Sequence, residues 1–326
     1  MPQWKKILQC NFTRVDKLAD FLELSDWQKT QLLVKPRFVL NIPLRLAAKM
    51  TKGTLDDPLF KQFVSTIAES ISSPEFQDDP VGDIPCRKSD KLLHKYQGRV
   101  LLVCTSACAM HCRYCFRQHF DYVNSDKLFE TELRIIGEDP SINEVILSGG
   151  DPLSLDDRIL GSLIARIAAI PHITKLRFHT RFPIGIPERI DEAFLTLLRD
   201  SRLQFWFIVH VNHPKELDTD VLHALKKIQK LGIPVLNQSV LLRGVNDDAD
   251  VLTELCQKLV DNGIHPYYIH QLDKVNGAAH FEVSEDHGKE LMNILLTKLP
   301  GYAIPRYVKE ISGEPSKTPI HILSTV

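Results

Sequence analysis

The sequence predicts an α/β fold: a partial (β/α)6 open barrel, preceded by a helical N-terminal extension and followed by a C-terminal segment. From residue 99 onward, short runs of β-branched and aromatic residues alternate with amphipathic segments of helical length. This alternation implies parallel strands joined by right-handed crossover helices. Six such units make three-quarters of a full eight-unit barrel. A doubly wound open sheet is the alternative.

The first 90 residues follow a different pattern. Amphipathic segments at 16–24 and 57–70 are interrupted by prolines, and a loop is expected at 72–89. Because proline ends helices, this part should consist of short helices. The proline positions are Pro36, Pro43, Pro58, Pro74, Pro80 and Pro85.

The barrel elements can be placed by residue range. The strand candidates are 99–104, 144–148, 175–180, 203–209, 235–241 and 266–270. The helix candidates are 127–138, 156–170, 187–199, 214–231, 247–261 and 284–298. We therefore divide the chain into an N-terminal extension at 1–90, a barrel at 91–300 and a C-terminal segment at 301–326.

Composition limits the function classes. Forty Lys and Arg residues against 41 Asp and Glu residues leave a formal net charge of −1, so direct nucleic-acid or anionic-membrane binding is not expected. No stretch approaches the roughly 18 apolar residues of a membrane span, and no secretory signal is visible. Seven cysteines, an odd number, suit a reducing compartment better than a secreted disulfide framework. We expect a cytoplasmic protein.

Unusual polar residues follow the predicted strands in turn. In both candidate architectures, sites form at the carboxyl ends of the strands. Three clustered cysteines follow the first strand, and residues 148–151 and 179–181 end the second and third. His210 and Asn212 follow the fourth strand, Gln238 lies in the fifth, and Asp273 follows the sixth. The predicted site therefore lies at this end of the sheet.

The clustered cysteines are Cys108, Cys112 and Cys115. Three thiolates can bind three irons of a 4Fe–4S cluster and leave the fourth iron open to a small molecule. Two plainer interpretations remain. The same spacing places the cysteines on one helix face, and His111 or His119 could complete a zinc site.

A lysine near the C-terminus has two interpretations as well. Lys317 lies in a loop rich in glycine and proline, where a lysine is usually solvated. To act as a nucleophile at neutral pH it would need local desolvation or neighbouring charge. Sequence alone does not decide between the two.

The cysteine motif, with Tyr114 just before the last cysteine, resembles the signature of the radical S-adenosylmethionine (SAM) superfamily. The resemblance implies that the open iron chelates SAM and that its reductive cleavage yields a 5′-deoxyadenosyl radical. It also places Tyr114 near the adenine. Ser148, Gly149, Gly150 and Asp151, which alone form only a good turn, resemble the motif that binds the methionyl amino group.

Longer stretches resemble the lysine 2,3-aminomutase family. They comprise residues 94–102, 237–247, 266–268 leading to Asp273, and 316–319. The resemblance covers nearly the whole chain from about residue 40. It implies conversion of L-lysine to β-lysine with a 4Fe–4S cluster, SAM and pyridoxal 5′-phosphate (PLP).

The resemblance also implies residue roles. Lys317 would form the aldimine with PLP, whose phosphate would lie by Lys95, Tyr96 and Arg99. The substrate carboxylate would meet Arg117, and its distal ammonium would meet Asp273 and Glu310. Gln238 and His210 would contact the adenosyl group. Each of these side chains could instead be a packed or solvated polar residue.

Some positions depart from the family pattern. The longer catabolic enzymes use C-terminal cysteines for zinc, but this sequence has no cysteine after Cys256, and Asp248 occupies a position where they have a cysteine. We predict no zinc. Where the family pattern implies a second acidic residue, seven positions before Lys317, this sequence has Glu310.

These departures resemble the bacterial branch that supplies β-lysine, through a dedicated ligase, to elongation factor P. Flavodoxin or ferredoxin is the expected type of electron donor. A catabolic aminomutase, an aminomutase for another amino acid such as glutamate, and a non-catalytic iron–sulfur protein are the alternatives. Asp273 disfavours glutamate, and the last alternative leaves Lys317 unexplained.

Overall fold

The computed structural model describes residues 1–71, 73–122 and 128–322. Within them, ten strands form one sheet whose neighbours follow chain order. Strands β3 to β9 run parallel, whereas β1, β2 and β10 pair antiparallel at the two edges. The strands are β1 (Arg87–Ser89), β2 (Leu92–Tyr96), β3 (Arg99–Val103), β4 (Glu144–Ser148), β5 (Lys175–Thr180), β6 (Gln204–His210), β7 (Val235–Val240), β8 (His265–His270), β9 (Arg306–Lys309) and β10 (Thr318–Pro319).

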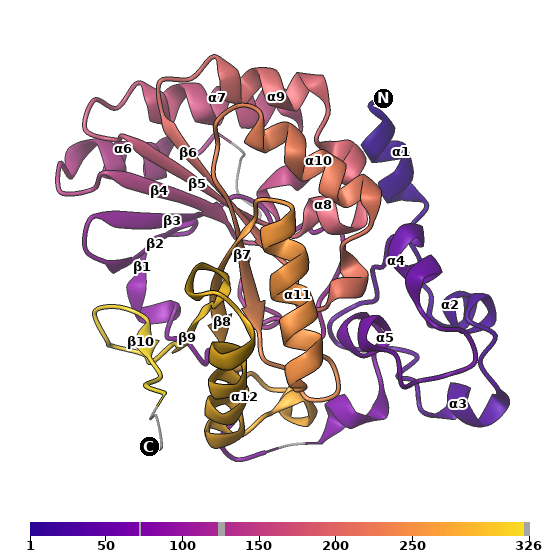
Figure 1. Ribbon diagram of the computed structural model, residues 1–326. Coiled ribbons are helices and arrows are strands. Elements are labelled where there is room, and N and C mark those ends of the chain that lie inside the picture. The colour runs from indigo at the N-terminus through magenta and orange to yellow at the C-terminus, as the bar shows by residue number, and fades with distance from the viewer. Residues whose placement is uncertain (72, 123–127, 323–326) are drawn as a thin grey trace.

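The strand order decides between the two predicted architectures. A doubly wound sheet reverses its strand order at a switch point, but this sheet never does. Its crossover helices therefore cover one outer side of a curved sheet (Figure 1). The partial open barrel is confirmed.

Seven α-helices follow β3 in the described part of the chain. They are α6 (Glu130–Glu138), α7 (Asp157–Ala168), α8 (Phe182–Gly185), α9 (Glu192–Arg199), α10 (Thr219–Gln229), α11 (Ala249–Asp261) and α12 (Glu285–Lys298). Residue 127, the predicted start of the first, lies outside the described residues. Helices α9 and α10 begin later than predicted because the proline-led 3-10 turns Pro187–Arg189 and Pro214–Glu216 precede them.

Side-chain caps fix several helix starts. Asp191, Asp218 and Ser284 each accept a hydrogen bond from a first-turn backbone N–H of α9, α10 and α12. Asp248 does the same for α11. This is the position at which the resemblance to the longer catabolic enzymes would place a cysteine. The Asp248 carboxylate accepts from the backbone N–H groups of Asp250 and Val251 at 2.8 and 3.1 Å.

A seventh parallel strand, β9, was not predicted. It lies in the segment 301–326, pairs with β8, and is followed by the antiparallel β10. With only four residues and with Arg306 and Lys309 at its ends, β9 has no apolar run of its own. Its position depends on pairing with a strand that is already in place.

The N-terminal extension forms short helices, as the prolines predict. They are α1 (Gln3–Gln9), α2 (Val15–Phe21), α3 (Asp26–Thr30), α4 (Leu44–Lys49) and α5 (Pro58–Phe63). Their buried side chains join the same hydrophobic core as those of the barrel. Trp4, for example, meets Phe182 of α8 edge-on, with ring centroids 5.5 Å apart. The extension is thus packed along one side of the barrel (Figure 1).

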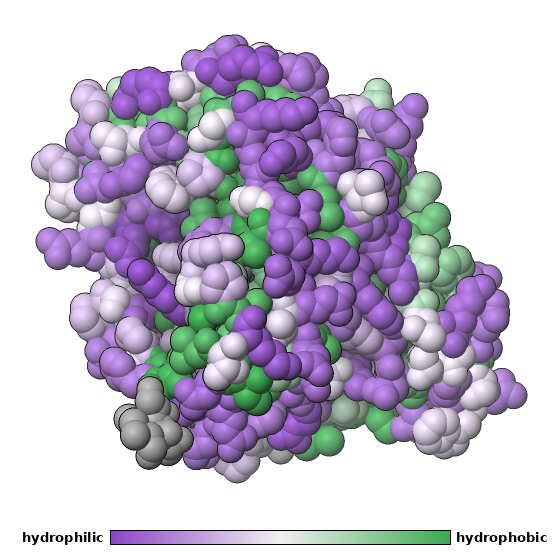
Figure 2. Space-filling view, in the orientation of Figure 1, coloured by the Kyte–Doolittle hydropathy of each residue, from purple (hydrophilic) through white to green (hydrophobic). Residues whose placement is uncertain are grey.

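The face shown in Figure 2 is largely hydrophilic. A hydrophobic area on it lies over the region of α12, β8 and β9. No helix in the described ranges is both long and apolar enough to cross a membrane.

Candidate active site

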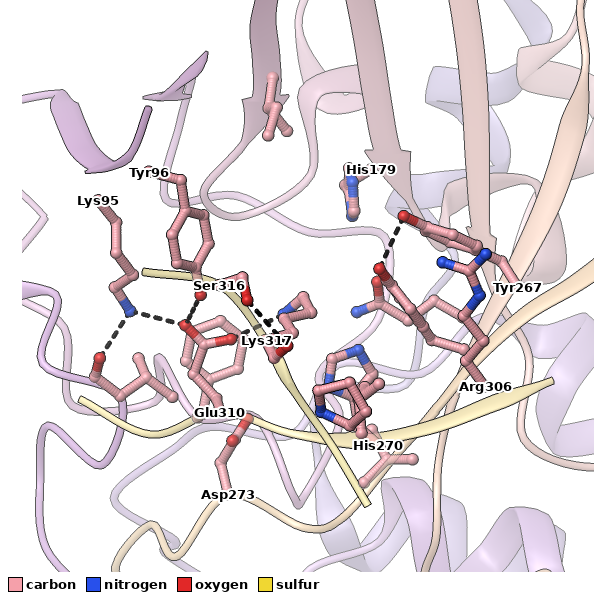
Figure 3. A pocket seen from close by; sticks show the side chains of 18 of the residues that line it. Lys95, Tyr96, His179, Tyr267, His270, Asp273, Arg306, Glu310, Ser316 and Lys317 are labelled. Atoms are coloured by element: carbon pink, nitrogen blue, oxygen red, sulfur yellow. Dashed lines mark hydrogen bonds and ion pairs between the residues drawn. The ribbon is translucent and has the colours of Figure 1, made fainter. Parts of the chain in front are cut away.

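A cavity of about 940 Å³ lies within the curve of the sheet. Strands β2 to β9, together with the loops that follow several of them, contribute side chains to its wall (Figure 3). The predicted site residues that line it are Lys95, Tyr96, Arg99, Arg117, Ser148, His210, Gln238, Asp273, Glu310 and Lys317. The three cysteines, Tyr114, Gly149, Gly150 and Asp151 are not part of this lining. Cys108 lies within electrostatic range of Cys112, Cys115 and Asp151, and Phe116 and Arg117 of the cavity wall follow Cys115 directly along the chain.

The loop that carries the cysteines is held from outside by the N-terminal extension. Asn41 donates through Nδ2 to the backbone oxygen of Cys108 at 3.0 Å and accepts from the backbone N–H of His111 at 3.0 Å. The backbone N–H of Arg113 donates to the backbone oxygen of Gln62 at 2.8 Å. Sequence reasoning did not connect the extension with the cysteines, because these partners are 50 or more residues away along the chain.

The three thiols are partly buried and close enough to influence one another. Burial and, to a smaller extent, the nearby Cys112 raise the pKa of Cys115 to about 11. Burial likewise raises the pKa of Cys108, with added contributions from Asp151 and the other two cysteines. Within the described residues, no three His, Cys, Asp or Glu side chains converge on one metal-ion position. In an iron–sulfur cluster each thiolate binds a different iron, so three neighbouring thiols are the donors that a cluster needs.

The glycine motif packs against the cysteine loop. Gly149 has φ +111°, a conformation that favours glycine. A Cβ on Gly150 would lie 2.4 Å from the backbone oxygen of Ala107. The backbone N–H groups of Gly150 and Asp151 donate to Thr105 and Ala107 at 2.7 and 2.8 Å. The motif therefore sets the position of the loop that carries the cysteines.

Asp151 is buried, and its carboxylate is engaged by the chain itself. It accepts from the Thr180 hydroxyl at 2.7 Å and from the backbone N–H groups of Arg181 and Phe182 at 2.8 and 3.0 Å. It also accepts from the backbone N–H of Leu153 at 3.0 Å. These contacts join the glycine motif to the end of β5.

Four neighbouring strands present polar side chains to the cavity: His179, His210, Gln238 and His270. Burial lowers the pKa of His210 to about 3 and also lowers the pKa values of His179 and His270. All three imidazoles are therefore neutral at neutral pH. His179 Nε2, Gln238 Oε1 and His270 Nε2 are buried without a hydrogen-bond partner in the described structure. Buried polar atoms are normally paired, so this wall fits a polar ligand.

Lys317 meets Glu310 at the cavity wall. Its Nζ donates to Glu310 at 2.8 Å, and Glu310 also accepts from the Tyr96 hydroxyl and from Lys95 Nζ (Figure 3). Burial alone would raise the pKa of Glu310. The Lys317 ammonium, the hydrogen bonds from Lys317 and Tyr96 and the charge of Lys95 together outweigh burial and lower the pKa to about 2.

Asp273 points into the same part of the cavity (Figure 3). Its carboxylate has no hydrogen bond or ion pair to any side chain among residues 1–71, 73–122 and 128–322. Burial raises its pKa to about 7, against the opposing effect of the Lys317 ammonium. A carboxylate that is largely withdrawn from water and lacks an ion-paired cation is costly, so this position favours a positively charged ligand.

Arg117 is held by a residue that the sequence did not single out. Its Nε donates to Asp83 at 2.8 Å, and Nη1 approaches the Ser148 hydroxyl at 3.4 Å. Both Arg117 and Asp83 are buried. Asp83 lies in a loop without a motif, so no sequence signal pointed to it.

Two cations at the cavity wall are free of carboxylates. Arg99 lies over the Tyr96 ring at 4.7 Å. In the described part of the chain, neither Arg99 nor Arg306 forms an ion pair. Arg306 was missed because it lies on β9.

One family model and several known proteins are similar to this chain. The family model described as the Radical SAM superfamily matches residues 102–256. The L-lysine 2,3-aminomutase of Escherichia coli (strain K12) is 43% identical over 295 residues, covering 88% of this chain and 85% of that protein. The protein of the same name from Haemophilus influenzae (strain ATCC 51907 / DSM 11121 / KW20 / Rd) is 40% identical over 319 residues, covering 97% and 94%.

Among solved structures, a radical SAM methyltransferase from Sphaerobacter thermophilus is similar, with a TM-score of 0.48 and 18% identity. The similarity covers 67% of this chain and 68% of that one. The family assignment comes from the sequence relatives, which match this chain over most of its length and over most of their own. The chain belongs to the radical SAM superfamily and, within it, to the L-lysine 2,3-aminomutase family.

Proposed function

We propose that this protein is an L-lysine 2,3-aminomutase that moves the α-amino group of L-lysine to the β-carbon. The observation that carries the proposal is Asp273, a cavity carboxylate that forms no ion pair with any residue the structure describes, beside Lys317 and Glu310. A substrate that ends in an ammonium group would supply the missing cation. The names of the sequence relatives support the same substrate.

The residues fit three cofactors. Cys108, Cys112 and Cys115 would hold a 4Fe–4S cluster. Gln238 and His210 stay our proposal for the adenosyl part of SAM, and the unpaired polar atoms of Gln238, His179 and His270 support it. Lys317 would hold PLP. When bound, the cluster and SAM supply a 5′-deoxyadenosyl radical that takes a hydrogen atom from the substrate, and PLP carries the migrating amino group.

The phosphate of PLP needs cations and hydroxyl donors. Lys95, Tyr96 and Arg99 stay our proposal for this role. In the structure, Lys95 and Tyr96 point toward Glu310, whereas Arg99 has no carboxylate partner among the residues described. Arg99 therefore supports the role most directly, and Arg306 at the same cavity joins it as a candidate.

At the other end, Arg117 would bind the substrate carboxylate. Its planar guanidinium can offer two parallel N–H donors to a carboxylate. Asp83 holds Nε, so the other nitrogens keep a set direction. We propose that Asp83 and Ser148 orient Arg117 rather than bind the substrate themselves.

Asp273 and Glu310 would bind the distal ammonium together. Asp273 has a pKa of about 7 without a ligand, so an arriving ammonium favours its ionised form. Glu310 is ionised throughout, but Lys317, Lys95 and Tyr96 already share its oxygens. Asp273 is therefore the main determinant for a side chain that ends in a cation.

The test is anaerobic reconstitution with iron, sulfide, PLP, SAM, a reductant and L-lysine, with mass spectrometry for β-lysine. We expect β-lysine from the wild type and none from Lys317→Ala. Lys309→Ala is the matched control, because Lys309 pairs with Glu285 at 2.7 Å and does not line the cavity. Absence of β-lysine from a fully loaded wild type would refute the proposal.

An aminomutase for glutamate is the competing activity. A substrate ending in a carboxylate should meet a cation, and Asp273 would repel it. Asp273→Lys should therefore reduce turnover of lysine far more than it reduces binding of SAM or PLP. Equal losses in all three would contradict the role of Asp273.

We further propose a cytoplasmic enzyme that supplies β-lysine for elongation factor P through the factor's ligase, with flavodoxin or ferredoxin as the electron donor. The helix-capping role of Asp248, at a position where the resemblance to the longer enzymes would place a cysteine, supports the resemblance to that branch. Mass spectrometry of elongation factor P from cells lacking this gene tests it. A factor with unchanged modification would favour a catabolic role.

A further inference from the structure

Arg181 has no role in the function proposed above, yet its side chain touches a cysteine of the predicted cluster. It follows β5 directly and is buried. Its backbone N–H donates to the Asp151 carboxylate at 2.8 Å, and this hydrogen bond fixes the backbone from which the side chain extends. From there the guanidinium reaches the cysteine loop.

The two terminal nitrogens of Arg181 have different partners. Nη1 donates to Cys112 Sγ at 2.9 Å and to the Tyr114 hydroxyl. Nη2 donates to Glu216 at 2.7 Å and to Gln62 at 2.6 Å. The guanidinium thus joins the cysteine loop on one side to a buried carboxylate and an amide on the other.

These anchors are themselves rigid. Glu216 is fully buried, and its second oxygen accepts from the backbone N–H groups of Asn212 and His213 at 2.9 and 3.0 Å. Gln62, from α5 of the N-terminal extension, donates to that same oxygen at 3.2 Å. The Arg181 guanidinium also lies over the Phe63 ring at 4.6 Å. Its position therefore does not depend on the cysteines.

A hydrogen bond from a cation to a ligating sulfur has a defined effect on an iron–sulfur cluster. It withdraws electron density from the thiolate and favours the reduced state, which carries one more negative charge. We propose that Arg181 is a positioning residue that holds Cys112 and raises the reduction potential of the cluster. Glu216 partly offsets its charge, and Gln62 and Glu216 direct it.

The redox step is the one-electron reduction of the cluster by an external reductant such as dithionite. The electron enters the cluster, the reductant is oxidised, and no bond forms or breaks in the protein. Arg181 changes only how favourable this step is. The inference rests on the cluster and not on the identity of the substrate.

The experiment measures the midpoint potential of the reconstituted full-length protein without SAM or lysine, by spectroelectrochemistry with iron and sulfide analysis. Arg181→Gln removes the cation and should shift the potential to a lower value. Arg181→Lys should recover part of that shift. Glu216→Gln removes the compensating anion and should shift the potential in the opposite direction, to a higher value.

Arg45→Gln is the matched control. Arg45 is also ion-paired, with Glu188 at 2.9 Å and Asp220 at 2.8 Å, but it contacts no residue of the cysteine loop in the described structure. We expect the cluster of Arg45→Gln to have the same midpoint potential as that of the wild type. If Arg181 had only a structural role, its substitution would change the amount of bound cluster. The midpoint potentials of the Arg181 variants and of Glu216→Gln would then not shift in opposite directions.

Two outcomes would overturn the proposal. The first is an Arg181→Gln variant with full iron content and the wild-type potential. The second applies if Arg181→Gln does not retain its cluster: the proposal is then refuted if iron-replete Arg181→Lys does not have a lower potential than the wild type and iron-replete Glu216→Gln does not have a higher one. Because the measurement needs neither substrate nor SAM, this failure is distinct from failure to make β-lysine.

Discussion

Asp273→Asn should make the protein more stable while it weakens lysine binding. Burial raises the pKa of Asp273 to about 7 in the folded protein, whereas an aspartate in an unfolded chain has a pKa of about 3.9. A folded pKa above the unfolded value means that ionisation opposes folding. The contribution of Asp273 to the free energy of unfolding is thus fully present below about pH 4, where the side chain is protonated in both states. It is lost as the pH rises through about 7.

The magnitude follows from this difference. About three pKa units at about 1.4 kcal/mol each correspond to about 4 kcal/mol above pH 7. Because the cavity beside Asp273 admits water, we expect about half of that, about 2 kcal/mol. For a chain of this size, the gain would raise Tm by about 3 °C. At pH 5.5 the gain should be about half as large as at pH 8.

The assay is urea unfolding of wild type and Asp273→Asn at pH 5.5 and 8, without lysine or PLP. Asp90→Asn, at an exposed turn between β1 and β2, is the control and should show no such pH-dependent gain. In a parallel turnover assay, Asp273→Asn should raise KM for lysine. A variant that is less stable at pH 8, or a stability difference that does not change with pH, would refute the reasoning.

Three further substitutions test the site. Gly150→Ala should lower bound iron several-fold by iron analysis, because its Cβ would clash with a backbone oxygen of the cysteine loop at 2.4 Å; Gly137→Ala, in open space, should keep its iron. Lys317→Ala should lose the PLP absorbance band and keep the iron–sulfur spectrum, so retention of the PLP band would contradict its role. Arg117→Lys should raise KM for lysine about tenfold or more, with unchanged iron, because an ammonium lacks the planar fork. An unchanged KM would exclude Arg117 from carboxylate binding.

Much of the fold was predictable because it depends on local pattern. Six strand–helix units recur with clear hydrophobic periodicity, and parallel strands joined by crossovers permit few arrangements. That argument left open the choice between a barrel and a doubly wound sheet, which only the strand order settled. Strand β9 escaped prediction because four residues with charged ends show no pattern.

The candidate site was only partly predictable. Strand-end residues such as His210, Gln238 and Asp273 could be grouped, because the carboxyl ends of parallel strands meet at one edge. Their roles in binding stay predictions. Asp83 and Gln62 could not be found, since each lies in a segment without a motif and acts on a residue far away in the chain.

The sequence by itself determined the spacing of Cys108, Cys112 and Cys115, the order of the strand units and the family. These properties depend on neighbouring residues, so they can be read along the chain. Tertiary structure alone decided which charges meet: Asp83 with Arg117, Glu310 with Lys317, and Arg181 with Cys112 and Glu216. Electrostatic effects depend on distance and burial, and both arise only when distant segments pack together.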